Sequence, residues 1–107
     1  MAKAKTNTED YLRMFRQMVR IRAFEDQANQ LYLSAKMPGL THMYSGQEAV
    51  AVGICEALTS DDKITSTHRG HGHCVAKGAE FKQMFCELLG KEEGYCRGKG
   101  GSMHIAD

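Results

Sequence analysis

The sequence predicts an α/β fold, of which these 107 residues hold only a part. Three stretches have the apolar spacing of amphipathic helices, and one short β-branched run, Ile64 to Thr67, has the composition of a strand. A lone strand leaves its backbone N–H and C=O groups unpaired, because these groups bond to neighbouring strands. We therefore expect the missing strands to come from further residues or from another chain.

Composition narrows the class of protein. The formal net charge is +1, from 14 Lys and Arg against 13 Asp and Glu, so the basic excess that attracts nucleic acid or membrane surfaces is missing. No apolar run reaches the about 18 residues that a membrane span needs, and the N-terminal segment lacks the apolar core of a secretory signal. Because the cysteines form no CxxC pair, we expect reduced thiols and a cytoplasmic location. The cysteines are Cys55, Cys74, Cys86 and Cys96.

The first predicted helix follows a loose tail over residues 1–7, and we expect a single domain over residues 8–107. Thr6 and Glu9 have the spacing of a capping box, which predicts the helix start there. Pro38-Gly39 is expected to end the helix. Its apolar stripe consists of Leu12, Phe15, Met18 or Val19, Ile21, Ala28 and Leu31. The other positions predict a solvated face formed by Arg13, Arg16, Arg20, Arg22 and Glu25.

A predicted loop over residues 40–44 carries His42, and a second helix follows it. Ser45 and Glu48 again have capping-box spacing, and the apolar pattern continues to Leu58. A helix N-terminus attracts anions through its free amides and its dipole, which adds weight to His42 just before it. A further amphipathic helix is predicted over residues 79–89, where Gly90 ends it.

The segment from Thr65 to His73 is the clearest candidate for a functional site. As the exit loop of the predicted strand, it places three histidines and an arginine between glycines. Arginine offers a forked, charged donor for phosphate or carboxylate, and histidine can donate, accept or bind metal near neutral pH. His68, His71, His73 and Cys74 could instead bind a metal ion, but no second ligand cluster pairs with them. Cys74 could also be a nucleophile, although free cysteines are more often small buried apolar residues.

A glycine-rich stretch, Gly98-Lys99-Gly100-Gly101, matches a phosphate-binding loop poorly. Three residues separate Gly94 from Gly98 where a P-loop has four, and glycine follows the lysine where Ser or Thr would stand. An ordered loop is therefore favoured over a phosphate site that is complete in itself.

Three motifs in a fixed order resemble one family when they are taken together. They run from Leu40 to Ala49, from Ile64 to His73 and from Gly98 to His104. From Tyr11 onward the chain resembles the alpha subunit of the thiamine-diphosphate-dependent first component of 2-oxo acid dehydrogenase complexes. Its Ser-Thr-His-Arg-Gly-His-Gly-His-Cys variant is most similar to the acetoin dehydrogenase branch, with the pyruvate dehydrogenase branch close to it.

The resemblance implies roles for individual residues. In the family a Tyr-Arg or His-Arg pair holds the cofactor diphosphate, and His68 and Arg69 match this pair. His42 matches an active-site histidine near the substrate, a place that suits adduct stabilisation or proton transfer. His71 and His104 match positions close to the site, without a defined role. No residue of this chain is expected to bind metal.

The resemblance also implies a reaction and partners. With thiamine diphosphate the family cleaves acetoin or decarboxylates a 2-oxo acid, and passes the hydroxyethyl unit to a lipoyl group on the acyltransferase component. A beta subunit completes an α2β2 heterotetramer and supplies the glutamate that activates the cofactor. In the family, Mg²⁺ is bound by a Gly-Asp-Gly…Asn segment that lies beyond the position of Asp107. We therefore expect about a third of such a subunit here, without activity of its own.

Two other classes stay open at this stage. One is a small metal-binding or regulatory module that uses the histidine cluster. The other is a non-catalytic assembly piece that pairs with a beta subunit through the N-terminal helix.

Overall fold

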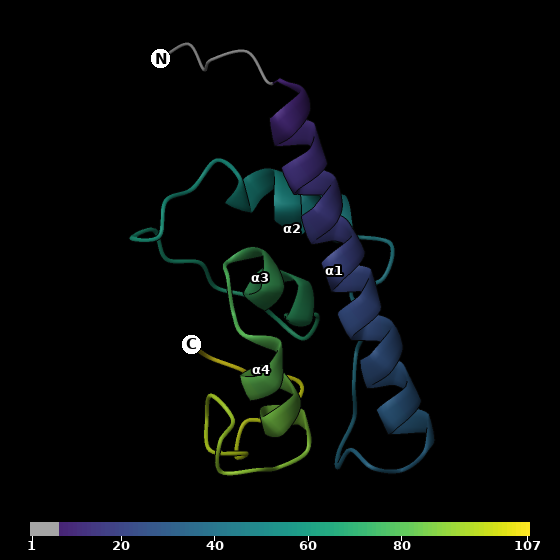
Figure 1. The fold of residues 1–107 in the computed structure, drawn as a ribbon. Coiled ribbons are helices and arrows are strands. Elements are labelled where there is room, and N and C mark those ends of the chain that lie inside the picture. The colour runs from purple at the N-terminus through teal and green to yellow at the C-terminus, as the bar shows by residue number, and fades with distance from the viewer. Residues whose placement is uncertain (1–6) are drawn as a thin grey trace.

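The computed structural model describes residues 7–107, and every regular element within them is a helix. The elements are α1 (Thr8–Leu33), α2 (Glu48–Cys55), α3 (His71–Ala76) and α4 (Phe81–Leu88). α1 forms the long axis of the molecule, and α2 and α3 pack against it and against each other (Figure 1). α4 reaches α1 through a stack of Phe85 on Phe24, whose ring centroids are 4.3 Å apart. No helix of this described part combines the length and apolarity that a membrane crossing requires.

Asn7 caps α1, one residue later than the sequence predicts. Its side chain accepts a hydrogen bond from the Asp10 N–H at 3.0 Å, and the Asp10 carboxylate accepts one from the Asn7 N–H at 3.2 Å. The predicted capping box of Thr6 and Glu9 is therefore wrong, because an equivalent Asn/Asp pair stands one position further on. Of the predicted tail, residues 1–6, which include Thr6, lie outside the described residues, and Asn7 is part of the helix cap.

The C-terminal end of α1 also comes earlier than predicted. The helix ends at Leu33 with Ser34 as its C-cap, and the next residue, Ala35, has a positive φ of 59°. The chain has therefore left the helix before it reaches Pro38-Gly39, and these residues belong to the connecting loop. This loop carries His42, as predicted.

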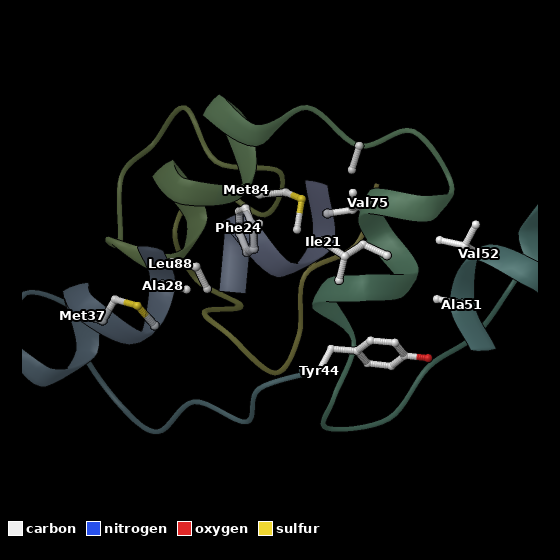
Figure 2. Packing of buried hydrophobic residues seen from close by; sticks show 11 residues of the cluster. Ile21, Phe24, Ala28, Met37, Tyr44, Ala51, Val52, Val75, Met84 and Leu88 are labelled. Atoms are coloured by element: carbon white, nitrogen blue, oxygen red, sulfur yellow. The ribbon is translucent and has the colours of Figure 1, made fainter. Parts of the chain in front are cut away.

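The core lies where the four helices meet (Figure 2). Ile21 and Ala28 of the predicted stripe are buried together with Phe24, and Met18 and Leu31 are partly buried against the core. The other apolar residues of the stripe lie on the opposite face of α1 and remain on the surface. These are Leu12, Phe15 and Val19, which are 58%, 63% and 49% exposed. The predicted stripe is thus confirmed from Met18 onward, with Met18 in place of Val19, and is wrong at Leu12 and Phe15.

Glu25 is completely buried, so its predicted place on a solvated face is wrong. It follows Ile21 by four residues and precedes Ala28 by three, and helical spacing puts all three on one face. A buried carboxylate requires hydrogen-bond donors, and the structure supplies them from His71 and from the backbone of Tyr44.

The predicted strand from Ile64 to Thr67 is absent from the described residues. The segment has neither helical nor ladder hydrogen bonding, because no second strand lies beside it to accept and donate such bonds. The predicted exit loop is also shorter than expected, since α3 begins at His71. The sheet of the predicted α/β fold is therefore not seen in residues 7–107, and the observed architecture is helical.

α2 begins without the predicted capping box. Its N-cap is Gln47, and no side chain caps it. The Glu48 carboxylate instead accepts the N–H of Gly46 at 2.8 Å and forms an ion pair with Arg22 of α1. The role predicted for Ser45 is therefore wrong, since Glu48 serves the packing of α2 on α1.

The predicted helix over residues 79–89 is confirmed as α4. Its apolar face buries Met84 and Leu88. Gly90 follows with a positive φ of 73°, and the next N–H, that of Lys91, bonds back to the Cys86 carbonyl at 2.8 Å. This is the helix ending that glycine favours.

Candidate functional site

The structure brings His42 and His68 together, although they come from different loops. Their ring centroids are 5.1 Å apart, and the ring planes are perpendicular. His42 is half-buried and His68 is exposed. The Nδ1 atom of His42 is buried and has no hydrogen-bond partner among the described residues. His42 therefore keeps one ring nitrogen whose hydrogen-bonding capacity is unused within the described residues.

Arg69 joins this pair through the backbone of the His42 loop. Its Nη1 donates a hydrogen bond of 2.6 Å to the carbonyl oxygen of Met43. The Arg69 residue as a whole is exposed. A guanidinium anchored at one nitrogen can still present two parallel donors to an oxyanion. His42, His68 and Arg69, the three residues that the sequence selects, thus form one surface cluster.

The other two histidines of the segment have separate partners. His71 is buried and bonds through Nδ1 to Glu25 at 2.6 Å and through Nε2 to Ser102 at 2.9 Å. His73 bonds to Ser66 and to the Tyr44 hydroxyl, and burial lowers its pKa. The described residues contain no group of three His, Cys, Asp or Glu side chains that could hold a metal ion. The histidines thus occupy three different environments, which disfavours a metal-binding module.

The glycine-rich loop is organised around a carboxylate of the protein. Glu87 of α4 is buried, and its two oxygens accept four backbone N–H groups at 2.5 to 3.1 Å. Burial alone raises the pKa of this carboxyl, but the four donors outweigh it and hold the pKa below its usual value. The donors are Cys96, Gly98, Gly100 and Gly101. Since Glu87 already occupies these amides, the preference for an ordered loop over a phosphate cradle is supported.

Cys74 is a poor nucleophile in this fold. Burial raises the pKa of its thiol to about 11, and the negative charge of Asp107 adds to the shift. A thiolate is the reactive form of cysteine, so a raised pKa leaves it unreactive near neutral pH. The alternative of a small buried apolar residue therefore fits Cys74 better. All four cysteines are free thiols in the structure.

A cavity of about 570 Å³ lies beside the candidate site and does not include it. It opens between the 60–67 segment and residues 102–107, and His73 and Cys74 line it. His42, His68 and Arg69 lie outside this cavity, on an open surface. An open cluster surrounds only one side of a ligand, so a further chain segment has to cover the other side.

Glu25 and Ser102 are the residues near the site that the sequence analysis misses. Glu25 carries a signal that could have revealed it, because its helical spacing places a carboxylate among buried apolar residues. Ser102 carries no such signal. It lies 31 positions after His71, and only tertiary folding brings their side chains together.

A family profile described as "Dehydrogenase E1 component" matches residues 16–107. The chain belongs to the dehydrogenase E1 component family. Its relatives include the acetoin:2,6-dichlorophenolindophenol oxidoreductase alpha subunit of Bacillus subtilis, 54% identical over 92% of this chain and 30% of that protein. The same subunit of Cupriavidus necator is 50% identical over the same shares. The chloroplastic pyruvate dehydrogenase E1 component subunit alpha-3 of Arabidopsis thaliana is 44% identical over 91% of this chain and 23% of that protein.

Membership of the E1 family confirms the resemblance and implies thiamine diphosphate as cofactor. The residues present fit the diphosphate end of that group. Arg69 offers a charged fork and His68 offers an exposed ring, which are donors that suit a diphosphate. The chain spans about 30% of the length of the curated relatives it matches first.

Proposed function

We propose that this E1 chain provides half of a thiamine diphosphate site, in a subunit that acts on acetoin or a 2-oxo acid. Residues 8–107 would form the N-terminal portion of the alpha-subunit domain, completed by a mostly parallel sheet. The observation that carries the proposal is the meeting of His42, His68 and Arg69 in one cluster. Nothing in the helical packing requires this cluster, since two of the three residues are exposed.

Each residue of the cluster has a task that its surroundings permit. Arg69 would bind two diphosphate oxygens with the donors that Met43 leaves free. His68 would donate one further hydrogen bond from its exposed ring. His42 would lie at the reacting end of the cofactor, where its imidazole can hold or transfer a proton. When bound, thiamine diphosphate supplies the electron sink for breaking a bond beside a carbonyl carbon.

Sequence identity to the relatives favours acetoin as the substrate. The two acetoin:2,6-dichlorophenolindophenol oxidoreductase subunits are 54% and 50% identical to this chain, compared with 44% for the Arabidopsis pyruvate dehydrogenase subunit. The cluster itself does not distinguish the substrates, because its charged group, Arg69, is assigned to the diphosphate.

Partners would complete the site. The open side of the cluster fits a beta subunit in an α2β2 heterotetramer, which would cover the cofactor and supply the activating glutamate. A lipoyl-bearing acyltransferase component would then accept the product. Mg²⁺ would be bound by a Gly-Asp-Gly…Asn segment of the alpha subunit, as the family resemblance implies. A cytoplasmic location is the corresponding expectation for the assembled enzyme.

Cofactor binding can be tested on the chain by NMR. Thiamine diphosphate added to millimolar concentration is expected to shift the ring signals of His42 and His68. Arg69→Ala should weaken this binding about tenfold or more, because hydrogen bonds to a charged group contribute about 1.5–3 kcal/mol. Arg16→Ala, which removes an exposed arginine of α1, is the matched control and should change affinity less than about twofold. Absence of any shift at His42 and His68 would refute the assignment.

Turnover gives the second test. The chain with a beta subunit is expected to show no thiamine-dependent reduction of 2,6-dichlorophenolindophenol, since it spans only 30% of its first relatives. Measurable dye reduction that depends on acetoin or pyruvate would contradict this expectation. Restoring a full-length subunit should restore activity, and His42→Asn should abolish most of it.

A further inference from the structure

A continuous chain of buried hydrogen bonds lies directly beneath the loop that carries His42. Glu25 of α1 bonds to His71 Nδ1 at 2.6 Å, and His71 Nε2 bonds to the Ser102 hydroxyl at 2.9 Å. The Ser102 hydroxyl in turn lies 3.0 Å from that of Thr41. The second oxygen of Glu25 accepts the backbone N–H of Tyr44 at 3.0 Å.

The two ends of this hydrogen-bond network hold the two ends of one loop. Thr41 precedes His42 directly, and Tyr44 follows it by two residues. The loop over residues 41–44 is thus fixed on both sides of His42 through a single imidazole, that of His71. Segments far apart in the sequence supply the anchors, since Glu25 comes from α1 and Ser102 from the glycine-rich loop.

Burial makes these contacts rigid. Glu25 is fully buried, His71 is 1% exposed and Ser102 is 6% exposed. The edge of the His71 ring also packs on Phe24, with centroids 5.5 Å apart. Buried polar groups are costly when a partner is lost, so such a network favours one arrangement strongly.

We propose that Glu25, His71 and Ser102 are positioning residues that clamp the 41–44 loop and so hold His42 toward the cofactor. The proposal rests on the function proposed above for His42, but the clamp itself is a property of the apo chain. None of the three residues touches the open cluster in which the cofactor would bind, so they act through His42.

The chemistry of these groups decides which of them donates and which accepts in each hydrogen bond of the network. A carboxylate only accepts, so the His71 Nδ1–H donates to Glu25, and in the neutral imidazole Nε2 is then the acceptor. Ser102 then donates to His71 and accepts from Thr41. Glu25→Gln should reverse this order: the amide N–H would donate to Nδ1, while the amide oxygen still accepts from Tyr44. The proton of His71 would move to Nε2 and be donated to Ser102.

The same three side chains have the order of a carboxylate–histidine–serine catalytic triad. The Ser102 hydroxyl is nevertheless held on both sides, by His71 and by Thr41, and is almost fully buried. Ser102 borders the 570 Å³ cavity, but its hydroxyl is engaged by both neighbours, so the positioning role fits these contacts better.

NMR of the chain tests the clamp without any cofactor. The amides of His42 and Met43 are expected to be rigid in the wild type, with order parameters near about 0.85, and to fall below about 0.6 in Ser102→Ala. Thr41→Val removes the hydrogen bond between Thr41 and Ser102 from the loop side and keeps Ser102. It is therefore the variant to measure if Ser102→Ala does not fold. The double variant should be no worse than Ser102→Ala alone, because Ser102→Ala already removes the contact that Thr41→Val breaks. Ser66→Ala, which removes the serine bound to His73, is the matched control and should leave the loop rigid.

Two further measurements distinguish the hydrogen bonds of the clamp from their effect on cofactor binding. The ¹⁵N shifts of His71 should show the proton on Nδ1 in the wild type and on Nε2 in Glu25→Gln. Thiamine diphosphate affinity should fall about fivefold in Thr41→Val, the equivalent of one net hydrogen bond.

The two proposals fail in different ways. Rigid His42 and Met43 amides in both Ser102→Ala and Thr41→Val would overturn the clamp, whatever the cofactor does. Labelling of Ser102 by a fluorophosphonate would also overturn it, in favour of a nucleophile. A loosened loop in a chain that binds no thiamine diphosphate would support the clamp and refute only the proposed function.

Discussion

The sharpest test of the fold is the replacement Glu87→Gln. The Glu87 carboxylate lies under the glycine-rich loop and accepts four backbone N–H groups, two on each oxygen. Glutamine keeps one oxygen and replaces the other with an NH₂ group. Two of the four backbone donors would then face another donor and lose their partner.

The expected loss of stability follows from these contacts. Hydrogen bonds to a charged group contribute about 1.5–3 kcal/mol each, so losing two costs about 3–6 kcal/mol. Domains of this size have about 5–15 kcal/mol of stability, so the variant should lose a large part of it. Urea unfolding followed by circular dichroism measures the change in the free energy of unfolding. Glu92→Gln makes the same charge change at an exposed position and is the control.

The pH dependence checks the same reasoning independently. The pKa of Glu87 is lowered in the folded chain, so the unfolded chain binds the proton more readily. Its contribution is therefore complete above the unfolded pKa of about 4.3 and disappears as the pH falls through the folded pKa. The stability difference between wild type and Glu87→Gln should shrink on acidification from pH 7 to pH 3. Equal stabilities of Glu87→Gln and Glu92→Gln at pH 7 would refute the account.

Further predictions concern packing and titration. Gly72→Ala should lower the melting temperature by several degrees, because its new Cβ would lie 2.3 Å from the Tyr44 ring, whereas Gly53→Ala in α2 meets no atom within 4 Å and should stabilise by about 0.5–1 kcal/mol. Equal melting temperatures would contradict this packing. Cys74 should resist iodoacetamide at pH 8, where a pKa of about 11 leaves about a thousandth as thiolate, and rapid alkylation seen by mass spectrometry would refute its burial. The pKa of His73 is lowered by burial, so its NMR titration midpoint should fall below about 6.5, and a higher midpoint would contradict that burial.

Local patterns in the sequence predict much of the helical structure. Apolar spacing finds α1 and α4, and glycine chemistry finds the end of α4 at Gly90. The capping boxes are less successful, because several polar residues near each helix start can serve as caps and packing selects among them. At the start of α2, the ion pair of Glu48 with Arg22 prevails over the predicted capping partner Ser45.

For the candidate site too, the sequence predicts some features and only the folded structure shows the others. The residue types and order of the motifs are sufficient to select His42, His68 and Arg69 and to indicate the E1 family, which the comparisons confirm. Their roles toward the cofactor stay predictions. The sequence does not reveal that the Met43 carbonyl anchors Arg69, or that His71 is enclosed by protein instead of facing the site.

The sequence by itself determined the helical periodicity, the glycine breaks and the three motifs, because these depend on residues close together along the chain. Only the tertiary structure decided which face of α1 is buried, since the other helices pack on the face of Ile21, Glu25 and Ala28. It also decided that Glu25 faces His71 and that Glu87 occupies the glycine-rich loop. A carboxylate can be solvated or buried at the same position of a helix, and the donors that permit its burial lie far away in the sequence.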